Sequence, residues 1–361
     1  LTLGGTINVG TFGDDGPGIY TVFDYSGNLT DNTLSVGTLP SGQDAAKVSV
    51  QTNQSGKVNI LNTNGGELTF WDGDNPANQD DGAQNGGDGT WTNEASNKSW
   101  TDHNYLLNGP WDDSGFAIFA SNKGTVTVDN SAGAVKASGM QFQTDGYEVT
   151  GGDLTLVSPA SNLSGAPIIR VGGGTNDGDM KATISAKLVG TDGMRKTYAG
   201  RLVLTADNQY TGGTDILGGT LQLGDGGTSG SVLGDIDTGI DGINRGLLAV
   251  DRSGTVTVDN TITGTGVVSI TGSGEITLSG NNSYSGGTYV RSGTLVVTQD
   301  DNLGPAESVV AVGADPEDVA GGATGNAVLK FGADFTGANT FTHTIELNTA
   351  QSQLDTNGHT V

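Results

Sequence analysis

The 361-residue sequence contains no cysteine, and this absence excludes a disulfide framework, a thiol nucleophile and a thiolate metal site. Basic residues are scarce, with 15 Lys and Arg against 40 Asp and Glu, so the net charge of −25 repels nucleic acid and anionic membrane surfaces. Apolar runs stay well short of the roughly 18 residues that a membrane helix needs, and Leu1 does not begin a signal peptide. We therefore expect a soluble segment with no nucleic-acid partner and no targeting signal of its own.

Glycine takes the place of bulky residues in this chain. There are 62 Gly residues, about 17% of the sequence against a usual share of about 7%. Thr, Val, Asn and Asp are frequent, and this mixture favours strands and turns over helices. The composition predicts an all-β fold that turns at glycine.

A short unit of glycine, one variable residue and an alternating apolar strand recurs along the chain. Examples are GGDLTL from 151, GGTLQL from 218 and SGTLVV from 292. Leu202 and Leu221 are nineteen residues apart, as are Ile276 and Leu295. Two or three short strands per coil of about twenty residues predict a β-solenoid, in which stacked coils bury their apolar faces on one another. A string of immunoglobulin-like sandwiches is the rival, but it does not explain the glycine corners.

Two longer segments share a more specific pattern, N-x-Y-[TS]-G-G-T followed by G-T-L. They are NQYTGGTDILGGTLQL at 208–223 and NSYSGGTYVRSGTLVV at 282–297. The recurring residues are Asn208, Tyr210, Gly212, Gly213, Thr214 and Gly219 in the first copy, and Asn282, Tyr284, Gly286, Gly287, Thr288 and Gly293 in the second. Both copies resemble the autotransporter-associated β-strand repeat, also called the passenger-associated transport repeat.

A second part of the chain also resembles bacterial autotransporter passengers, through WDG at 71–73, FAIFA at 116–120 and MQFQTDGYEVTGGDLTL at 140–156. The resemblance covers about residues 66–300 and implies a right-handed parallel β-helix. We expect β-helix coils over residues 1–65 and a Trp- and Asp-rich insertion with a return strand over 66–120. Coils should resume over 121–361, with transport-type repeats at 199–224 and 274–298.

The resemblance also implies a location and a role. Such passengers are secreted through their own outer-membrane β-barrel, which lies outside this segment, and are displayed on or released from a Gram-negative cell. We expect a structural or adhesive surface segment that contacts copies of itself, as in a biofilm, or neighbouring cell-surface proteins or glycans. The alternatives are a polymerising extracellular fibre and a β-helical glycan-active enzyme.

Trp71, Trp91, Trp100 and Trp111 lie close together in the sequence, interleaved with an acidic stretch. As an exposed platform they would stack on sugars, and Asp72, Asp74, Asp80 and Asp81 would be weak candidates for a Ca²⁺ site. The competing interpretation, which we favour, is an insertion whose tryptophans pack as a local core.

Catalytic signatures are incomplete throughout the sequence. His103, His343 and His359 are too scattered for a metal cluster, and no H-E-x-x-H motif occurs. Adjacent aspartates occur, but none is accompanied by the remaining residues of a pectinase signature. We therefore expect a non-enzymatic chain with no cofactor other than, at most, Ca²⁺.

Overall fold

The computed structural model describes residues 1–11, 16–63, 66–159, 165–174, 177–239, 246–306, 308–313 and 326–361. The chain forms two compact units. Unit 1 comprises Leu1–Ala182, Leu188–Asp192 and Thr197–Gly200, and unit 2 comprises Thr183–Lys187, Gly193–Lys196 and Arg201–Val361. Across the described ranges the regular elements are β-strands and the short 3₁₀ turns η1 (Ala45–Lys47), η2 (Pro76–Asn78) and η3 (Asp300–Leu303). No helix in these ranges has the length and apolar character to cross a membrane. The all-β prediction is confirmed.

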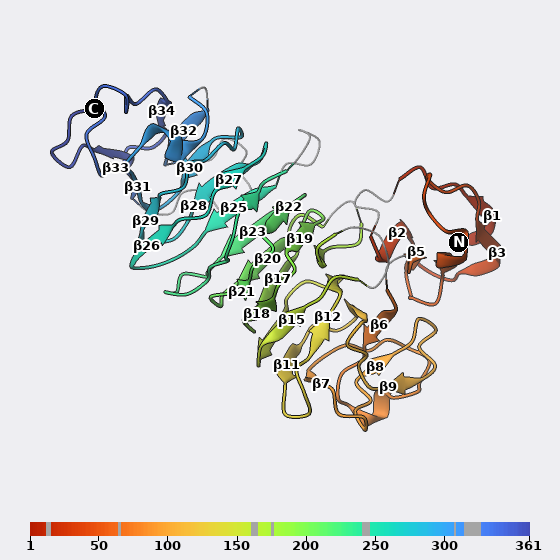
Figure 1. Ribbon diagram of the computed structural model, residues 1–361. Helices are drawn as coiled ribbons and strands as arrows, with labels where there is room; N and C mark the ends of the chain where they lie inside the picture. The colour runs from red at the N-terminus through yellow and green to blue at the C-terminus, as the bar shows by residue number, and fades with distance from the viewer. Residues whose placement is uncertain are drawn as a thin grey trace. The chain divides into compact units, whose positions relative to one another are not determined.

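Unit 1 contains a solenoid of parallel strands (Figure 1). One sheet stacks β6 (Leu68–Trp71), β10 (Phe116–Phe119), β13 (Gly139–Phe142) and β16 (Ile168–Val171). A second stacks β7 (Gly89–Thr92), β11 (Thr125–Asp129) and β14 (Tyr147–Gly151), and a third stacks β12 (Lys136–Ala137), β15 (Leu154–Leu156) and β18 (Leu188–Gly190). Each coil therefore contributes two or three strands, and each of these strands belongs to a different sheet.

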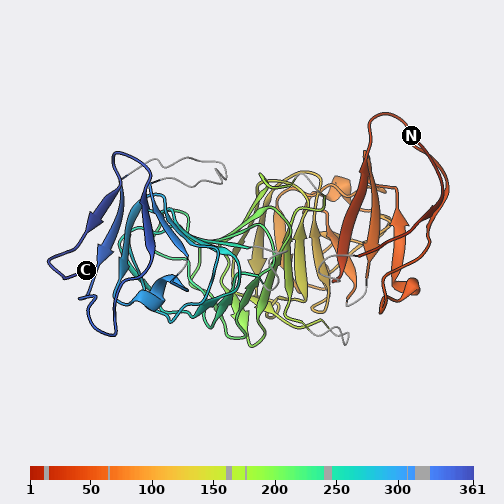
Figure 2. The same ribbon diagram turned by 90° about the horizontal axis from the view of Figure 1, so that it is seen from above.

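Unit 2 repeats this arrangement with more coils, as Figure 2 shows for its stacked strands. One sheet contains β20 (Arg201–Leu204), β23 (Thr220–Leu223), β25 (Leu247–Val250), β28 (Val267–Ile270), β30 (Thr288–Val290), β32 (Val309–Val312) and β34 (Thr344–Leu347). A second contains β19 (Met194–Thr197), β22 (Thr214–Ile216), β24 (Ile236–Asp237) and β27 (Ile262–Thr263). A third contains β26 (Thr255–Val258), β29 (Glu275–Leu278), β31 (Gly293–Val297), β33 (Ala327–Phe331) and β35 (Gln353–Asp355). Two further coil strands are β17 (Lys181–Ile184) and β21 (Gln209–Tyr210).

The register confirms the periodicity read from the sequence. Leu202 pairs directly with Leu221 on the next strand, and Ile276 pairs with Leu295. All four side chains are fully buried, because each coil covers the apolar face of its neighbour. The fold is a parallel β-helix, as the sequence predicted.

Residues 1–65 differ from the coils expected there. β1 (Thr2–Ile7) pairs in parallel with β3 (Thr30–Val36), but β5 (Lys57–Asn62) pairs antiparallel with both β2 (Gly18–Asp24) and β4 (Val48–Gln51). For β4 and β5 the reason is the short link between them, which turns through Gly56 at a φ of 79°. A link of this length permits an antiparallel hairpin, whereas a parallel pair needs a longer crossover.

The insertion expected over 66–120 is also subdivided. β6, β7 and β10 within it are coil strands with parallel partners, while β8 (Trp100–Thr101) and β9 (Asn108–Gly109) form a short antiparallel extension of β6. The inserted segments are therefore the links between these coil strands.

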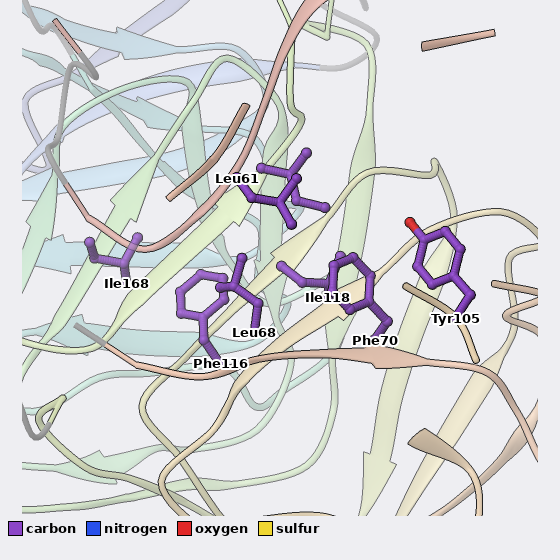
Figure 3. Packing of buried hydrophobic residues seen from close by; sticks show 8 residues of the cluster. Leu61, Leu68, Phe70, Tyr105, Phe116, Ile118 and Ile168 are labelled. Carbon is purple, nitrogen blue, oxygen red and sulfur yellow. The ribbon is translucent and has the colours of Figure 1, made fainter. Parts of the chain in front are cut away.

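The β2–β5–β4 sheet covers the outer face of the β6–β10–β13–β16 sheet. Leu61 from the covering sheet belongs to one buried cluster with Leu68, Phe116 and Ile168 (Figure 3). Ile19 of the same sheet also belongs to this cluster. Polar groups complete the contact, since the Gln141 amide accepts from Ile19 N and donates to Ile19 O, both at 2.8 Å. Arg170 lies fully buried with its guanidinium 4.8 Å from the centre of the Tyr20 ring.

Glycine is required in unit 2 where coils touch backbone to backbone. A Cβ on Gly266 would lie 2.1 Å from the carbonyl oxygen of Gly246, and one on Gly286 would lie 2.2 Å from that of Gly266. Real Cβ atoms do not approach so closely, so this corner admits glycine alone in successive coils. The high glycine content thus follows in part from coil stacking.

We predict that Gly266→Ala destabilises unit 2 by about 1–3 kcal/mol, because the added methyl must displace backbone. The measurement is the midpoint of urea unfolding followed by far-UV circular dichroism. Gly227→Ala is the matched control, since a Cβ there meets no atom within 4 Å. Equal midpoints for the two variants would contradict the close-contact explanation.

Candidate functional site

The four tryptophans pack together inside unit 1. Trp71, Trp91, Trp100 and Trp111 are at most 6% exposed. The ring centres lie 4.5 Å apart for Trp100 and Trp111, 4.8 Å for Trp91 and Trp111, and 5.0 Å for Trp71 and Trp100. The Trp71–Trp100 and Trp91–Trp111 pairs are edge-to-face, and the Trp100–Trp111 pair is tilted at 44°. The side chains form a local core and present no open face to a sugar.

This cluster is the first layer of the aromatic interior of the unit 1 solenoid. Phe119 lies 5.9 Å from Trp91 and stacks on Phe142 of the next coil at 4.9 Å. Tyr147 continues the contact, with its ring 5.5 Å from Phe119. Sequence analysis did not single out these three residues, although the apolar run FAIFA was the available signal.

The four aspartates accept hydrogen bonds from the segments around this core. Asp72 accepts from Asn85 N at 2.6 Å and from Asn108 Nδ2 at 2.8 Å, and burial raises the pKa of its carboxyl. Asp80 accepts from Asn108 N at 2.6 Å. Within the described ranges, no three His, Cys, Asp or Glu residues lie close enough to hold a metal ion together.

Asp74 and Asp81 are used in the same way. Asp74 accepts from Thr90 N at 2.7 Å and from the Ser99 hydroxyl. Asp81 accepts from Ala83 N at 2.8 Å and from Asn85 Nδ2 at 2.9 Å. Asp81 therefore satisfies donors of its own loop, whereas Asp74 joins its loop to β7 and to the residue before β8.

The two sequence repeats build the same corner in unit 2. In the first, the Tyr210 hydroxyl lies 2.7 Å from Thr214 Oγ1, and in the second the Tyr284 hydroxyl lies 2.6 Å from Thr288 Oγ1. Both tyrosine rings are fully buried, and burial raises the pKa of each phenol. The repeated tyrosine and threonine therefore form an internal polar contact within the apolar core.

The repeated asparagines join neighbouring coils. Asn208 Nδ2 donates to the Ser231 carbonyl at 3.0 Å, and Asn282 Nδ2 donates to the Asn302 carbonyl at 2.7 Å. Asn282 Oδ1 also accepts from Ile262 N at 2.8 Å. Because Ile262 and Asn302 belong to the coils before and after it, Asn282 links three successive coils.

The repeated glycines turn the chain at equivalent positions. Gly213 and Gly287 have φ values of 84° and 92°, and Gly219 and Gly293 have values of 62° and 73°. These left-handed conformations favour glycine strongly. Gly212 and Gly286 precede the first turn of each copy, and a Cβ on Gly286 would meet the preceding coil.

The two copies occupy different faces of the solenoid. The first copy supplies β22 and β23, and the second copy supplies β30 and β31. β23, from the second half of its copy, shares a sheet with β30, from the first half of the other copy. The repeat therefore specifies a corner and not a particular sheet.

Comparison with known families and proteins agrees with this geometry. The family model for the passenger-associated transport repeat matches residues 194–223 and 271–297. The adhesin BmaC autotransporter of Brucella suis biovar 1 (strain 1330) is 41% identical over 274 residues, which is 72% of this chain. The chain spans 8% of the length of that relative. No solved structure gives a significant match.

We predict that Asn282→Ala destabilises unit 2 by about 2 kcal/mol, because it removes buried hydrogen bonds to two neighbouring coils. Urea unfolding followed by circular dichroism measures the change. Asn348→Ala is the control, since Asn348 is exposed. A loss of stability no larger than that of the control would show that the asparagine does not link the coils.

We predict that Trp91→Ala destabilises unit 1 by about 3–5 kcal/mol, since it empties the centre of a packed core. The fluorescence of the three remaining tryptophans, all in unit 1, reports its urea unfolding. Unchanged stability together with weakened saccharide binding would instead support the exposed platform.

Proposed function

We propose that this chain, a segment of an autotransporter passenger that carries passenger-associated transport repeats, is a non-enzymatic adhesive segment. The chain is extracellular, at the surface of a Gram-negative bacterium or secreted from it. The observation that carries the proposal is the 41% identity with an autotransporter named as an adhesin. The identity extends over most of this chain, so it includes far more than the transport repeats.

The architecture supports a role in display. Each coil completes the hydrogen bonds of the coil before it, as the Asn282 contacts with Ile262 and Asn302 illustrate. A chain that emerges from a secretion pore can therefore fold one coil at a time outside the cell. We infer that the two transport repeats assist this step by fixing corners as neighbouring coils arrive.

The side chains singled out by sequence make contacts within the fold, so we place the adhesive contacts on other residues. The tryptophans fill a core, the aspartates brace loops, and the repeated Asn, Tyr and Thr residues bond internally. Their chemistry is used within the fold. We propose that the partners are neighbouring surface proteins or glycans, or further copies of this chain.

We expect beads coated with the 361-residue chain to attach to cultured animal cells several-fold more often than albumin-coated beads. Attachment is counted by microscopy after washing at fixed shear. Beads carrying the chain after irreversible heat unfolding provide the control for charge, since they retain the net charge of −25.

Two outcomes would overturn the proposal. Equal attachment of chain-coated and albumin-coated beads, together with a monomeric chain in sedimentation velocity, would remove the adhesive role. Release of new reducing ends from a panel of polysaccharides would favour the glycan-active enzyme. Sedimentation velocity of the chain in solution measures whether copies associate, and so separates attachment to cells from aggregation between copies.

A further inference from the structure

A polar cavity of about 50 Å³ lies in unit 1, beside the edge of the covering sheet. Thr21 and Asp24 of β2 and Lys57 of β5 line one side. The other side comes from the segments that follow β13 and β16, through Gln143 and the Gly173–Gly174 turn. Since a buried water needs roughly 10–15 Å³ by this measure, the cavity accommodates about three to five water-sized groups.

Gln143 is the unusual residue of this cavity. Both its amide nitrogen and its amide oxygen are buried, and neither has a hydrogen-bond partner. An unpaired buried amide costs about 1–3 kcal/mol for each group, so such residues usually find partners. Neither amide atom exposes surface to the cavity in this conformation, so a ligand in the cavity reaches the amide when the Gln143 side chain turns toward it.

The other polar side chains of the lining each have a hydrogen-bond or ion-pair partner. Asp177 Oδ2 accepts from the backbone nitrogens of Gly173 and Gly174, both at 2.6 Å. Thr21 Oγ1 donates to Asn59 Oδ1 at 2.9 Å, and Lys57 pairs with Asp24 at 2.8 Å. These bonds hold the rest of the lining in place. The Gln143 amide is the group of the lining that can form new hydrogen bonds with a ligand.

The ligand must accept a hydrogen bond from the Gln143 amide nitrogen and donate one to the amide oxygen, from groups a few ångströms apart. Hydroxyl groups do both, whereas a metal cation cannot accept a hydrogen bond. Asp177 adds negative charge, because Lys57 already pairs with Asp24, and this disfavours anionic ligands. Phe23, which lies between the lining residues Thr21 and Asp24 in sequence, is 48% exposed and adds an apolar surface next to this strand.

We propose that this cavity binds the hydroxyl groups of a neutral saccharide, with the Gln143 amide as the principal hydrogen-bonding group. The proposal rests on the adhesive function above and names a glycan as its target. The site is separate from the buried tryptophan core. It also gives a role to Gly173, because a Cβ there would lie 2.8 Å from Gln143 Nε2 and would obstruct the amide.

Saturation-transfer NMR of the full 361-residue chain tests this assignment. The probes are glucose, galactose, mannose and N-acetylglucosamine, their common disaccharides, and sialic acid as an anionic comparison. We expect transfer to at least one neutral sugar with a Kd of about 1 mM, typical of a single small site, and weaker transfer to sialic acid.

Gln143→Leu should weaken binding about tenfold or more while the unfolding midpoint stays equal or rises, because an unpaired buried amide has been replaced by an apolar group. Gly173→Ala should weaken binding by a similar factor through obstruction of the amide. Gln351→Leu makes the same substitution at an exposed position and should leave binding unchanged.

Absence of transfer to every sugar at tens of millimolar would overturn the assignment, as would binding that survives both Gln143→Leu and Gly173→Ala. A lowered unfolding midpoint for Gln143→Leu without any sugar binding would show that the amide serves only the fold. Bead attachment without sugar binding would overturn this site alone. Sugar binding without bead attachment would overturn the adhesive function alone.

Discussion

Close approach of backbone to backbone at the coil corners is the constraint on which the rest of this fold depends. Parallel strands in neighbouring coils are held about 4.8 Å apart by their hydrogen bonds, so a corner has the same limited space. In the column of Gly246, Gly266 and Gly286, a carbonyl occupies the place of a Cβ. The scarcity of bulky residues and the abundance of glycine are two consequences of this spacing.

The same spacing determines what polar groups can do at the corners. A short amide side chain reaches the backbone of the adjacent coil, as Asn282 reaches Asn302 and Asn302 in turn reaches Gly280 at 3.1 Å. Asn260 makes the equivalent contact with Val232 at 3.1 Å. Asparagine recurs because it supplies a donor and an acceptor at this reach, and each corner is completed only when its neighbouring coil is present.

Sequence periodicity was sufficient to predict the coils but not what covers them. The nineteen-residue spacing of Leu202 and Leu221 predicts their pairing. In a solenoid, residues one coil length apart in the sequence lie side by side on neighbouring strands. The strand KVNI at 57–60 alternates in the same way whether its neighbour is parallel or antiparallel, and the short link before it decides the outcome. Composition likewise could not distinguish a buried tryptophan cluster from an exposed one. Gln143 gave no signal, since an unpaired amide is a property of its surroundings.

These differences explain where recognition can arise on a repetitive scaffold. A regular coil face offers the same strand pattern at every level, and its polar groups are paired with the coils above and below. In unit 1 the β2–β5–β4 sheet interrupts this regularity, so that β10, β13 and β16 are buried on both faces and outward residues such as Gln141 bond to the cover. At the edge of that cover the pairing is incomplete, and Gln143 is left without a partner. The irregular cover therefore creates the unsatisfied polar group that specific binding requires, while the coils hold it in place.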